Sequence, residues 1–376
     1  MNILITGGAG FIGSHLSLRL LQMGHKVRVL DNLSEQIHGV DPLVTSPLYN
    51  SIIKKVEFLK GSVTSKFDWE NAIEGQDIIV HLAAETGTGQ SMYEIKRYTS
   101  VNIQGTSLML DILVNNTHSI RKVIIASSRS IYGEGKYFSK ELGIVYPNHR
   151  SEGDMVKGDF EVKYPGTESL KLISTDETSK IHPSSVYGIT KQVQEQLVMK
   201  VCAAVGIAAV AFRYQNVYGP GQSLSNPYTG ILSIFSNRIR NGLKINIFED
   251  GFESRDFVYI DDVVDATVAG IEKEEANNTI FNVGTGKPTT VLQVAKTLMK
   301  HLGIEVPCEI SGMFRLGDIR HNFAEIKLLK ERLNVVPKVD FEQGIFKFVS
   351  WVKDQSKMEN NYESSLNEMK NKGLLK

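Results

Sequence analysis

The chain has 376 residues, of which 41% are hydrophobic and 22% are charged, and its 42 basic side chains balance its 42 acidic ones. This composition is ordinary for a globular protein of one large domain or two that pack closely, and it argues against a nucleic-acid-binding surface. The sequence has only two cysteines, no basic leader before its apolar start and no run apolar enough for a transmembrane helix. These features argue against a disulfide scaffold or a membrane protein and predict a cytoplasmic one.

The first elements of the chain predict a phosphate-binding turn. Residues 2–6 indicate a strand, residues 11–23 a helix and residues 26–31 a second strand. Gly7, Gly10 and Gly13 lie between strand and helix, where glycine lets the backbone approach a pyrophosphate. Asp31 ends the second strand, where a carboxylate can hold both ribose hydroxyls of an adenosine and repel a 2′-phosphate. The pattern favours NAD(H) as cofactor, with NADP(H) as the alternative.

The alternation of strands and helices continues to residue 128 and indicates right-handed βαβ units. Further strands are expected at 56–63, 77–84 and 121–128, and a helix at 101–116. The predicted fold class is therefore α/β, a Rossmann-type doubly wound parallel sheet. Residues 134–182 break the rhythm, and a structureless stretch of that length is uncommon in a compact domain. We expect an insertion with its own local fold there.

Regular structure resumes with a helix at 185–206 and a strand at 208–219. Beyond Pro220 the pattern is mixed, with helices expected at 229–242 and 289–303 and strands at 243–248 and 279–285. These segments predict a smaller C-terminal α/β lobe. The predicted domains are thus 1–220, 221–355 completed by parts of the N-terminal region, and a polar tail, 356–376, that is a frayed helix or disordered.

Hydroxyl and amino groups follow these elements in a pattern that suits proton transfer. Tyr187 and Lys191 are four residues apart and so share one face of the expected helix. A nearby ammonium favours the phenolate and lowers the pKa of a tyrosine from its usual value of about 10. Such a pair can move a proton on and off a sugar hydroxyl. By itself, the spacing is more often an ordinary amphipathic pair.

The combination of these motifs resembles the extended short-chain dehydrogenase/reductases, and more closely the nucleotide-sugar epimerase/dehydratase family. The resemblance covers residues 1 to about 355. It rests on the glycine turn, on Ser127 and Ser128 at a strand end, on the Tyr187/Lys191 pair, and on further motifs in the same order. These are HLAAETG (81–87), VNIQGT (101–106), FRYQNVYGPG (212–221), SRDFVYIDDV (254–263) and FNVGTG (281–286).

The resemblance implies roles for individual residues. Ser128, four residues before Tyr132, is the implied catalytic hydroxyl beside Tyr187 and Lys191. The segment 221–355 is the implied sugar-nucleotide-binding lobe. The implied substrate residues are Glu85, Arg129, Asn216, Arg255 and Arg315, with Arg255 on the diphosphate and Arg320 as an alternative to Arg315. The implied cofactor residues are Gly7, Gly10, Phe11, Ile12, Gly13, Asp31, Asn32, Val63, Leu82, Ala83, Ala84, Asn102, Ser127, Tyr187, Lys191 and Tyr214. Ser62 stands where some relatives have an acidic residue that holds adenine, which puts that contact in doubt.

The strand-end motif argues against one reaction of this family. Its 4,6-dehydratases carry Thr-Asp-Glu before Val-Tyr-Gly, and the acid and base eliminate water. Here the aligned residues are Ser128, Arg129 and Ser130. The Thr-Asp-Glu at 175–177 lies elsewhere, just ahead of the expected helix, and is interpreted as a surface turn or helix cap. The reaction that remains for this chain is oxidation or reduction at a sugar carbon, without elimination of water.

The branch that resembles this chain most acts on dTDP-6-deoxyhexoses, which bacteria use for surface polysaccharides such as the lipopolysaccharide O-antigen. It includes 4-epimerases and 4-keto reductases, and both reactions use the same serine, tyrosine and lysine. Many epimerase-like relatives carry what looks like a zinc knuckle in the insertion. The matching positions here are Ser139, Leu142, Tyr164 and Thr167, so no metal site is expected. This absence favours reduction of a dTDP-4-keto-6-deoxyhexose at C4, with the dTDP-L-rhamnose 4-epimerase type as the alternative.

Two further hypotheses complete the sequence analysis. An inactive protein that senses NAD(H) or binds a partner is the alternative of another class, because a fold alone does not specify a function. Family resemblance also implies a homodimer built on two helices of each subunit, one of them bearing Tyr187. An apolar stripe on that helix could serve such an interface, although core packing is the default interpretation of a stripe.

Overall fold

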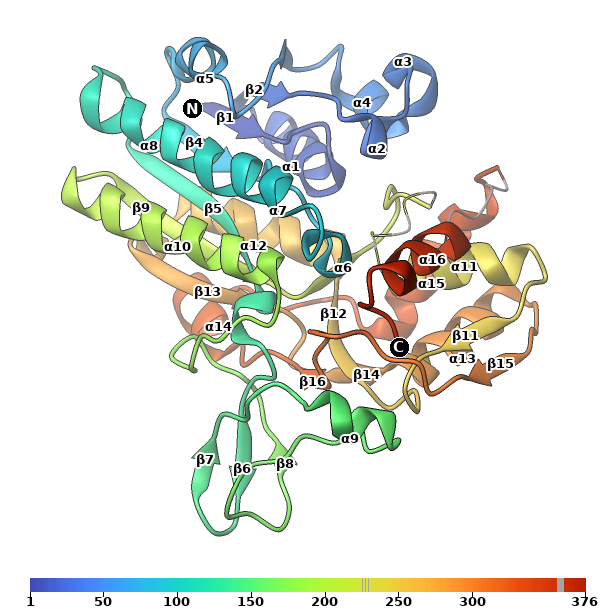
Figure 1. The fold of residues 1–376 in the computed structure, drawn as a ribbon. Coiled ribbons are helices and arrows are strands. Elements are labelled where there is room, and N and C mark those ends of the chain that lie inside the picture. Colours follow the sequence, from blue (N-terminus) through green and yellow to red (C-terminus); the bar gives the residue numbers. More distant parts are fainter. Residues whose placement is uncertain (225, 227, 229, 357–361) are drawn as a thin grey trace.

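The computed structural model describes residues 1–224, 226, 228, 230–356 and 362–376, which form a parallel sheet with helices on both faces (Figure 1). The main sheet has seven strands in the order β13-β9-β5-β4-β1-β2-β3, and every neighbouring pair is parallel. The predicted α/β fold class is confirmed. The strands of this sheet are β1 (Asn2–Thr6), β2 (Lys26–Asp31), β3 (Glu57–Lys60), β4 (Ile78–His81), β5 (Lys122–Ser128), β9 (Ala208–Tyr214) and β13 (Thr279–Val283).

Both faces of the main sheet are covered by helices, which explains its nearly continuous apolar strands. Ile3 and Ile5 of β1 belong to the core on the side of α1 (Phe11–Gln22) and α12 (Ile260–Glu272), which pack on each other. Leu4 points to the opposite core, beneath α5 (Lys66–Ile73), α8 (Gly105–Asn115) and α10 (Val186–Ala204). The strand order reverses between β1 and β4, and such a switch point opens a crevice at the carboxyl ends of the strands.

The smaller lobe contains β10 (Asn216–Tyr218), β12 (Ser254–Tyr259), β14 (Pro288–Thr290) and β16 (His321–Asn322) in one sheet and β11 (Ile245–Ile247) with β15 (Cys308–Ile310) in another. Its helices are α11 (Ile231–Arg240), α13 (Val291–Leu302) and α15 (Phe341–Lys353). One prediction was wrong here, because the strand expected at 279–285 in this lobe is β13 of the main sheet. Phe281 stacks on Phe212 of β9, and this contact across 69 residues is invisible to local sequence patterns.

Short helices and turns connect these elements. They are α2 (Glu35–His38), α3 (Pro42–Thr45), α4 (Pro47–Ile52), α6 (Thr88–Ser91), α7 (Ile95–Tyr98), the π-helix η1 (Thr99–Gln104), the 3₁₀ turns η2 (Arg129–Tyr132) and η3 (Glu274–Ala276), and α14 (Lys327–Leu333). The helix expected at 101–116 is therefore divided into η1 and α8.

The insertion forms a small unit of its own at the bottom of Figure 1, in the way that the sequence predicts. Its three-stranded antiparallel sheet has the order β7 (Gly143–Val145), β6 (Tyr137–Ser139), β8 (Lys171–Leu172), and α9 (Glu152–Val156) follows β7. Tyr137, Val145 and Val162 form a separate buried cluster.

The Thr-Asp-Glu segment at 175–177 is not a surface turn. Thr175 is fully buried and pairs through its backbone with Ala324. Glu177 accepts a hydrogen bond from the backbone N–H of Asn282 in β13 at 2.8 Å. The segment therefore ties the insertion to the main sheet, and the prediction failed because these partners are more than 100 residues away.

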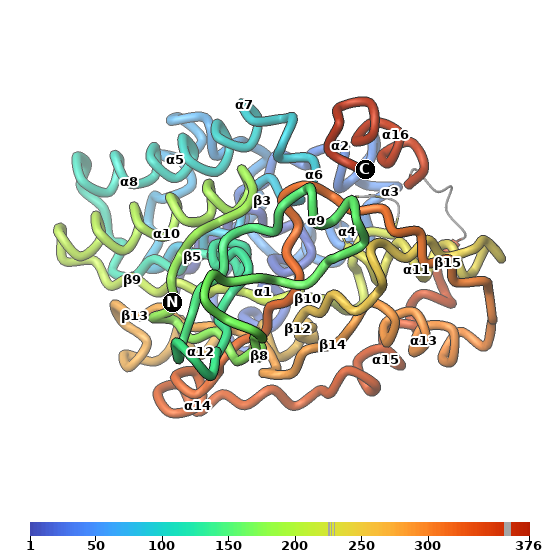
Figure 2. Tube along the Cα trace, turned by 60° about the horizontal axis from the view of Figure 1, so that its bottom comes forward, coloured from blue at the N-terminus to red at the C-terminus, as the bar shows by residue number. Residues whose placement is uncertain are grey.

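The C-terminal tail also differs from its prediction. Residues 357–361 lie outside the described residues, but Tyr362–Asn371 form α16, which buries Tyr362, Leu366 and Met369. Leu375 is buried as well, and the backbones of Phe314 and Lys376 exchange two hydrogen bonds of 2.9 and 3.0 Å. Figures 1 and 2 both place α16 beside α6. Its few apolar residues are spaced for one helix face, a pattern that the polar composition of the tail conceals.

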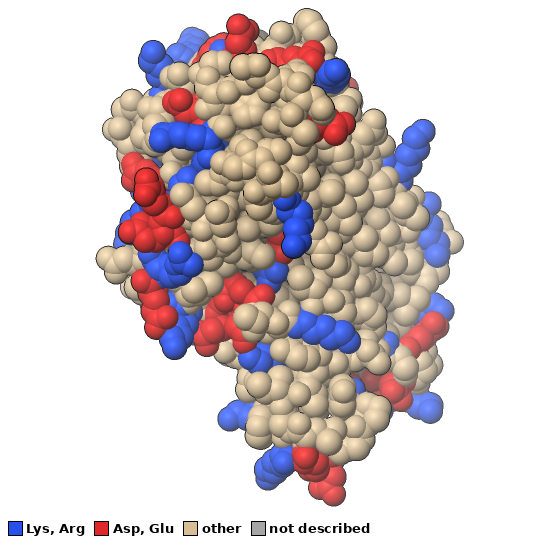
Figure 3. Space-filling model, turned by 90° about the vertical axis from the view of Figure 1, so that its left-hand side faces the viewer, with Lys and Arg blue, Asp and Glu red and all other residues tan. Residues whose placement is uncertain are grey.

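Charged side chains of both signs interleave on the face of the molecule drawn in Figure 3, which also has a broad area without charges. This distribution agrees with the zero net charge of the chain. Among the residues that the structure describes, no helix is long and apolar enough to cross a membrane.

Candidate active site

A cavity of about 920 Å³ lies at the carboxyl ends of the parallel strands, between the main sheet and the smaller lobe. The structure brings together at this cavity every predicted catalytic, cofactor-binding and substrate-binding residue except Asn102. These residues come from the ends of β1, β2, β4, β5 and β9, from α10 and from loops of the lobe. Ligand sites in open α/β sheets occupy this edge.

The turn after β1 is shaped for close approach of a ligand to the backbone. Gly7 has a φ of +68°, and a Cβ there would lie 2.8 Å from the backbone nitrogen of Ala83. A Cβ on Gly13 would lie 2.4 Å from the carbonyl oxygen of Gly7. Gly10, the N-cap of α1, supplies no side-chain cap, so N–H groups of the first helical turn remain available to an anion.

Asp31 lies at the end of β2 and is 8% exposed. Its carboxylate accepts hydrogen bonds from the backbone N–H groups of Ala9 (3.0 Å) and Leu33 (2.9 Å). Burial raises the pKa of Asp31, while these bonds and the charge of His38 oppose the shift. Each carboxylate oxygen keeps a lone pair that can accept a ribose hydroxyl.

Ser128 and Tyr187 both line the cavity, and the Ser128 side chain is close enough to Tyr187 to influence its pKa. Ser128 Oγ accepts from the N–H (3.2 Å) and the hydroxyl (2.9 Å) of Ser130. Burial raises the pKa of Tyr187, and the Ser128 side chain and the charge of Arg129 lower it in part. Arg129 therefore adds a positive charge that favours the phenolate of Tyr187.

Lys191 is buried and lies on a chain of hydrogen bonds instead of against Tyr187. Its Nζ donates to Gln194 Oε1 at 2.9 Å, and Gln194 Nε2 donates to Thr106 Oγ1 at 2.8 Å. His81 Nε2 lies 3.0 Å from the same Thr106 oxygen. Burial lowers the pKa of Lys191 to about 7, with the charge of Glu195 opposing. The chain of contacts holds the amine at the cavity wall.

Three arginines form a cationic wall on the lobe side of the cavity. Arg255 and Arg315 share Asp318, with distances of 3.0 and 2.8 Å to its two carboxylate oxygens. Burial and nearby Arg255 lower the pKa of Arg129 to about 9, so it stays cationic at neutral pH. Its Nε donates to Asn216 Oδ1 at 2.8 Å. Because three guanidinium groups face one carboxylate here, the wall suits an anionic ligand.

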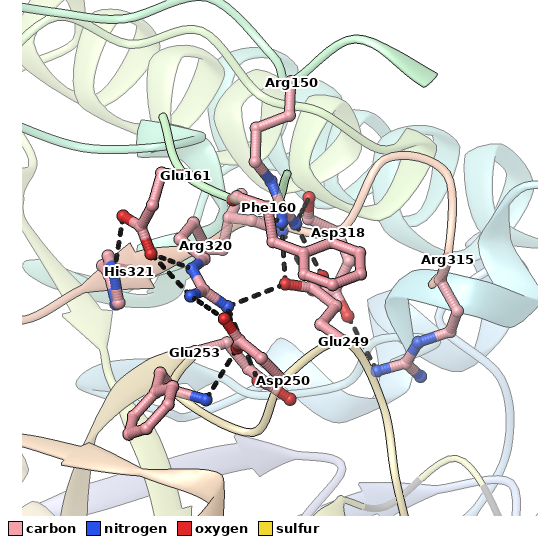
Figure 4. A network of polar contacts seen from close by, with 12 residues as sticks. Arg150, Phe160, Glu161, Glu249, Asp250, Glu253, Arg315, Asp318, Arg320 and His321 are labelled. Atoms are coloured by element: carbon pink, nitrogen blue, oxygen red, sulfur yellow. Dashed lines mark hydrogen bonds and ion pairs between the residues drawn. The ribbon is translucent and has the colours of Figure 1, made fainter. Parts of the chain in front are cut away.

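Arg320, the sequence-based alternative to Arg315, lies outside the cavity lining. It donates to Glu161 at 2.6 Å, to Asp250 at 2.7 Å and to Glu249 at 3.1 Å. Arg150 of the insertion pairs with the same Glu249 at 2.8 Å (Figure 4). This network anchors the insertion to the lobe, behind the arginines that line the cavity.

Asn102 also differs from its prediction, because it does not line the cavity. Its amide accepts from the backbone N–H of Glu85 (2.8 Å) and donates to Glu85 O (3.1 Å) and Thr190 Oγ1 (2.9 Å). It therefore fixes the loop after β4 to α10. Glu85 lines the cavity, and its carboxylate pairs with Arg97 at 2.8 Å.

Two strand-end residues line the cavity while their hydroxyls have partners elsewhere. Ser127 Oγ donates to Glu195 at 2.5 Å, and the hydroxyl of Tyr214 lies 2.8 Å from Thr267 Oγ1 of α12. Ser127 and Tyr214 therefore shape the wall of the cavity, while their hydroxyls bond to other residues of the protein.

The sequence profile of the NAD dependent epimerase/dehydratase family matches residues 3–151 and 163–284. The chain belongs to this family. The dTDP-L-rhamnose 4-epimerase of Burkholderia thailandensis is 37% identical over 354 residues, which cover 93% of this chain and 94% of that enzyme. The family prediction and the prediction of an NAD-dependent enzyme are confirmed.

Solved structures of epimerases in this family share the fold over nearly the whole chain. The UDP-glucose 4-epimerase of Thermotoga maritima with UDP-glucose has a TM-score of 0.76 and 31% identity, covering 94% of this chain and 99% of its own. The Thermus thermophilus UDP-glucose 4-epimerase with NAD has a TM-score of 0.74 and 26% identity, covering 95% and 100%. These relatives favour the epimerase alternative over the reductase that the missing zinc knuckle suggested.

In this member of the family, the knuckle positions are filled by ordinary turn contacts. Thr167 donates from its hydroxyl to Tyr164 O at 2.8 Å, and Ser139 hydrogen-bonds Glu141. Among the described residues, no group of His, Cys, Asp and Glu side chains could hold a metal ion.

No local pattern in the sequence indicates several residues at the lobe end of the cavity. Asn246 lies in β11 and Phe248 follows it, Glu253 precedes β12, and Leu366 and Met369 come from α16. No spacing connects these positions, because only the packing of the lobe and the tail brings them together.

Proposed function

We propose that the protein is an NAD-dependent 4-epimerase of a dTDP-6-deoxyhexose, of the dTDP-L-rhamnose type. The observation that carries the proposal is that Ser128, Tyr187 and cationic Arg129 line one cavity together with the glycine turn. Similarity over nearly the whole length to a dTDP-L-rhamnose 4-epimerase supports the choice of reaction and substrate. Two free cysteines fit a reducing cytoplasm, where we place the enzyme.

The residues around the β1 turn fit NAD. Gly7 and Gly13 pack too closely on neighbouring backbone to admit a Cβ, which holds the turn against the N-terminus of α1, where a pyrophosphate can bind. Asp31 suits ribose hydroxyls and disfavours a 2′-phosphate. When bound, NAD supplies the hydride acceptor and donor of the reaction. Gln36 of α2 and Gln90 of α6 join their amides at 3.2 and 3.3 Å beside this part of the cavity. A contact of this kind favours retention of the cofactor, which an epimerase needs between its two half-reactions.

The proposed chemistry depends on moving a proton at the C4 oxygen of the sugar. Tyr187 removes the hydroxyl proton when C4 is oxidised and returns a proton when the opposite face is reduced. Arg129 stabilises the phenolate that accepts the first proton. Ser128 Oγ already accepts two hydrogen bonds from Ser130, so its own hydrogen is the one that can turn from Tyr187 to the sugar oxygen when the sugar is bound. The two residues that follow Ser128 are Arg129 and Ser130, and neither is a carboxylic acid that could expel water, so the sugar keeps its substituents.

The arginine wall is the proposed binding site of the diphosphate. Arg255 and Arg315 both pair with Asp318, and Asn216 Oδ1 accepts a hydrogen bond from Arg129. Asn216 and Glu85 complete the proposed sugar site between this wall and Tyr187.

The reaction can be tested with the purified protein and no added cofactor. We expect interconversion of dTDP-L-rhamnose with its C4 epimer, resolved by chromatography of the sugar nucleotides. The same protein should leave NADH unchanged when it is mixed with dTDP-4-keto-6-deoxyglucose. Stoichiometric loss of NADH with formation of a dTDP-6-deoxyhexose would instead establish the reductase.

We also propose a homodimer that is built on α8 and α10. Ile189 of α10 is 48% exposed and Val114 of α8 is 49% exposed, although both are large and apolar. Val193 and Leu197 extend the α10 stripe and remain partly accessible. Val193→Glu should yield monomers in sedimentation experiments, whereas Gln196→Glu, at an exposed polar position of the same helix, should leave the dimer intact. A wild-type protein that sediments as a monomer would contradict this proposal.

A further inference from the structure

We propose that α16 is a specificity-determining wall of the substrate site, and that it covers the nucleotide-base end of a bound nucleoside diphosphate. This inference rests on the proposed function, because it takes the ligand to be a nucleotide sugar. Tyr362, Ser365, Leu366 and Met369 all line the cavity from one face of α16. The remaining surface of the helix, including Ser364 and Asn367, is exposed.

The cavity face of α16 packs directly on the lobe. Tyr362, Leu366 and Met369 form one apolar cluster with Leu375, against which Phe248 and Ile234 pack. The guanidinium of Arg315 lies 5.6 Å from the centre of the Phe248 ring, and Arg315 pairs through its backbone with Leu375. The helix is therefore next to Arg315, which belongs to the proposed diphosphate-binding site. The nucleoside of a bound nucleotide is attached to the diphosphate and would extend from there along α16.

Contacts on both sides of the cavity hold α16 in this position. Towards the main sheet, the hydroxyls of Tyr93 and Tyr228 lie 3.2 and 3.3 Å from Glu368 Oε2. Towards the lobe, Arg238 pairs with Glu363 at 2.8 Å and lies 5.5 Å from the centre of the Tyr362 ring. The segment thus bridges the two walls of the cleft, and both views of the chain place it over the end of α6 (Figures 1 and 2).

Buried polar atoms without a hydrogen-bond partner occur at the same end of the cavity. Within the described residues they are Asn246 Oδ1, Arg315 Nε and Glu253 Oε2, the last of which lies 3.9 Å from Arg320 Nη1. All three residues line the cavity. An apolar ring with polar edges and a hydroxylated sugar would satisfy these atoms while its faces meet Phe248 and the apolar side chains of α16. A pyrimidine nucleoside has this chemistry.

Binding of dTDP to the full-length protein with its cofactor tests the inference by calorimetry. Ser365→Trp fills the proposed base end and should weaken dTDP binding at least tenfold, whereas Ser364→Trp, on the exposed face, should change it less than twofold. Leu366→Ala removes part of the wall without filling the site and should also weaken binding, with Asn367→Ala as its control. Cofactor content and melting temperature report whether each variant keeps the fold.

Two results would overturn the inference. The first is unchanged dTDP affinity in folded Ser365→Trp and Leu366→Ala. The second is a wild-type protein that binds neither dTDP nor UDP. Because the readout is binding, it does not depend on turnover: loss of affinity in these variants together with absence of 4-epimerase activity would retain the wall and reject the proposed reaction.

Discussion

At the scale of single residues, Arg129 explains how a strand end that resembles that of a dehydratase can support a different reaction. Arg129 stands at the position of the acid that a dehydratase needs, and its positive charge lowers the pKa of the Tyr187 hydroxyl. Its own pKa, lowered by burial to about 9, still leaves it charged at neutral pH. A cation at this position stabilises the phenolate but cannot donate the proton that elimination requires.

Arg129→Met should shift the pH–rate profile. Removal of the cation raises the pKa of Tyr187, so the limb of the profile that reports formation of the phenolate should move to higher pH. Arg129→Lys should restore part of the shift, because an ammonium also stabilises the phenolate. Profiles of kcat measured from pH 6 to 10 check the prediction, and an unshifted limb in the methionine variant would contradict it.

Tyr187→Phe tests the proton transfer itself. Loss of a positioned acid–base group lowers turnover by a factor of about 10² to 10⁴. The variant should keep its cofactor and its melting temperature, since Phe preserves the ring and removes only the hydroxyl. A variant that epimerises at the wild-type rate would remove Tyr187 from the mechanism.

At the scale of elements, a buried ion pair joins α10 to β9 of the main sheet. Arg213 of β9 donates to both carboxylate oxygens of Glu195, at 2.6 and 2.9 Å, and also to the Tyr132 hydroxyl at 2.7 Å. Both charged side chains are almost fully buried. The pair therefore fixes the helix that carries Tyr187 and Lys191 against the strand end that carries Ser128.

Glu195→Leu should lower the free energy of unfolding by about 3 to 5 kcal/mol, because it leaves the Arg213 charge buried without its partner. The double variant Glu195→Leu/Arg213→Met should recover much of the loss, since it removes both charges. Urea denaturation of the two variants checks this, and equal destabilisation in both would show that the charge pairing is not the cause.

At the scale of the whole molecule, the lobe and the tail complete the cavity, and the insertion is anchored to the lobe behind it. The ionic network of Figure 4 holds the insertion on the lobe, and α16 spans from the lobe to the loop after α6. Glu134 contributes to this junction by accepting from the backbone N–H of Arg320 at 2.7 Å. Burial raises its pKa from 4.5 to about 7, although Arg150 opposes the shift.

This pKa predicts a pH dependence of stability. Between about pH 4.5 and 7 the folded protein keeps a proton on Glu134 that the unfolded chain releases, so the contribution of this group to the free energy of unfolding falls as pH rises. Glu134→Gln removes the titration and should gain stability relative to the wild type between pH 5 and 8, by up to about 3 kcal/mol. Glu168→Gln, at an exposed position of the insertion, serves as control and should show no such gain.

Much of the fold and the central chemistry follow from local sequence. The glycine turn, the alternation of strands and helices, and the hydroxyls at the end of β5 lie within short segments whose residue types and spacing carry the information. Ser128, Tyr187 and Lys191 meet at one cavity because parallel strands end at a common edge, a rule that needs no atomic detail.

The tertiary structure alone decided the features that depend on distant contacts. The polar tail forms a wall of the cavity, and β13 belongs to the main sheet. Asn102 holds a loop and does not line the cavity. Arg320 pairs with carboxylates outside the cavity, whereas Arg315 lines it. The choice between such partners depends on how packed elements bury their apolar faces and pair their charges. These energies depend on residues that are from 17 to 159 positions apart in the examples of Asn102 and Arg320, so no local pattern in the chain expresses them.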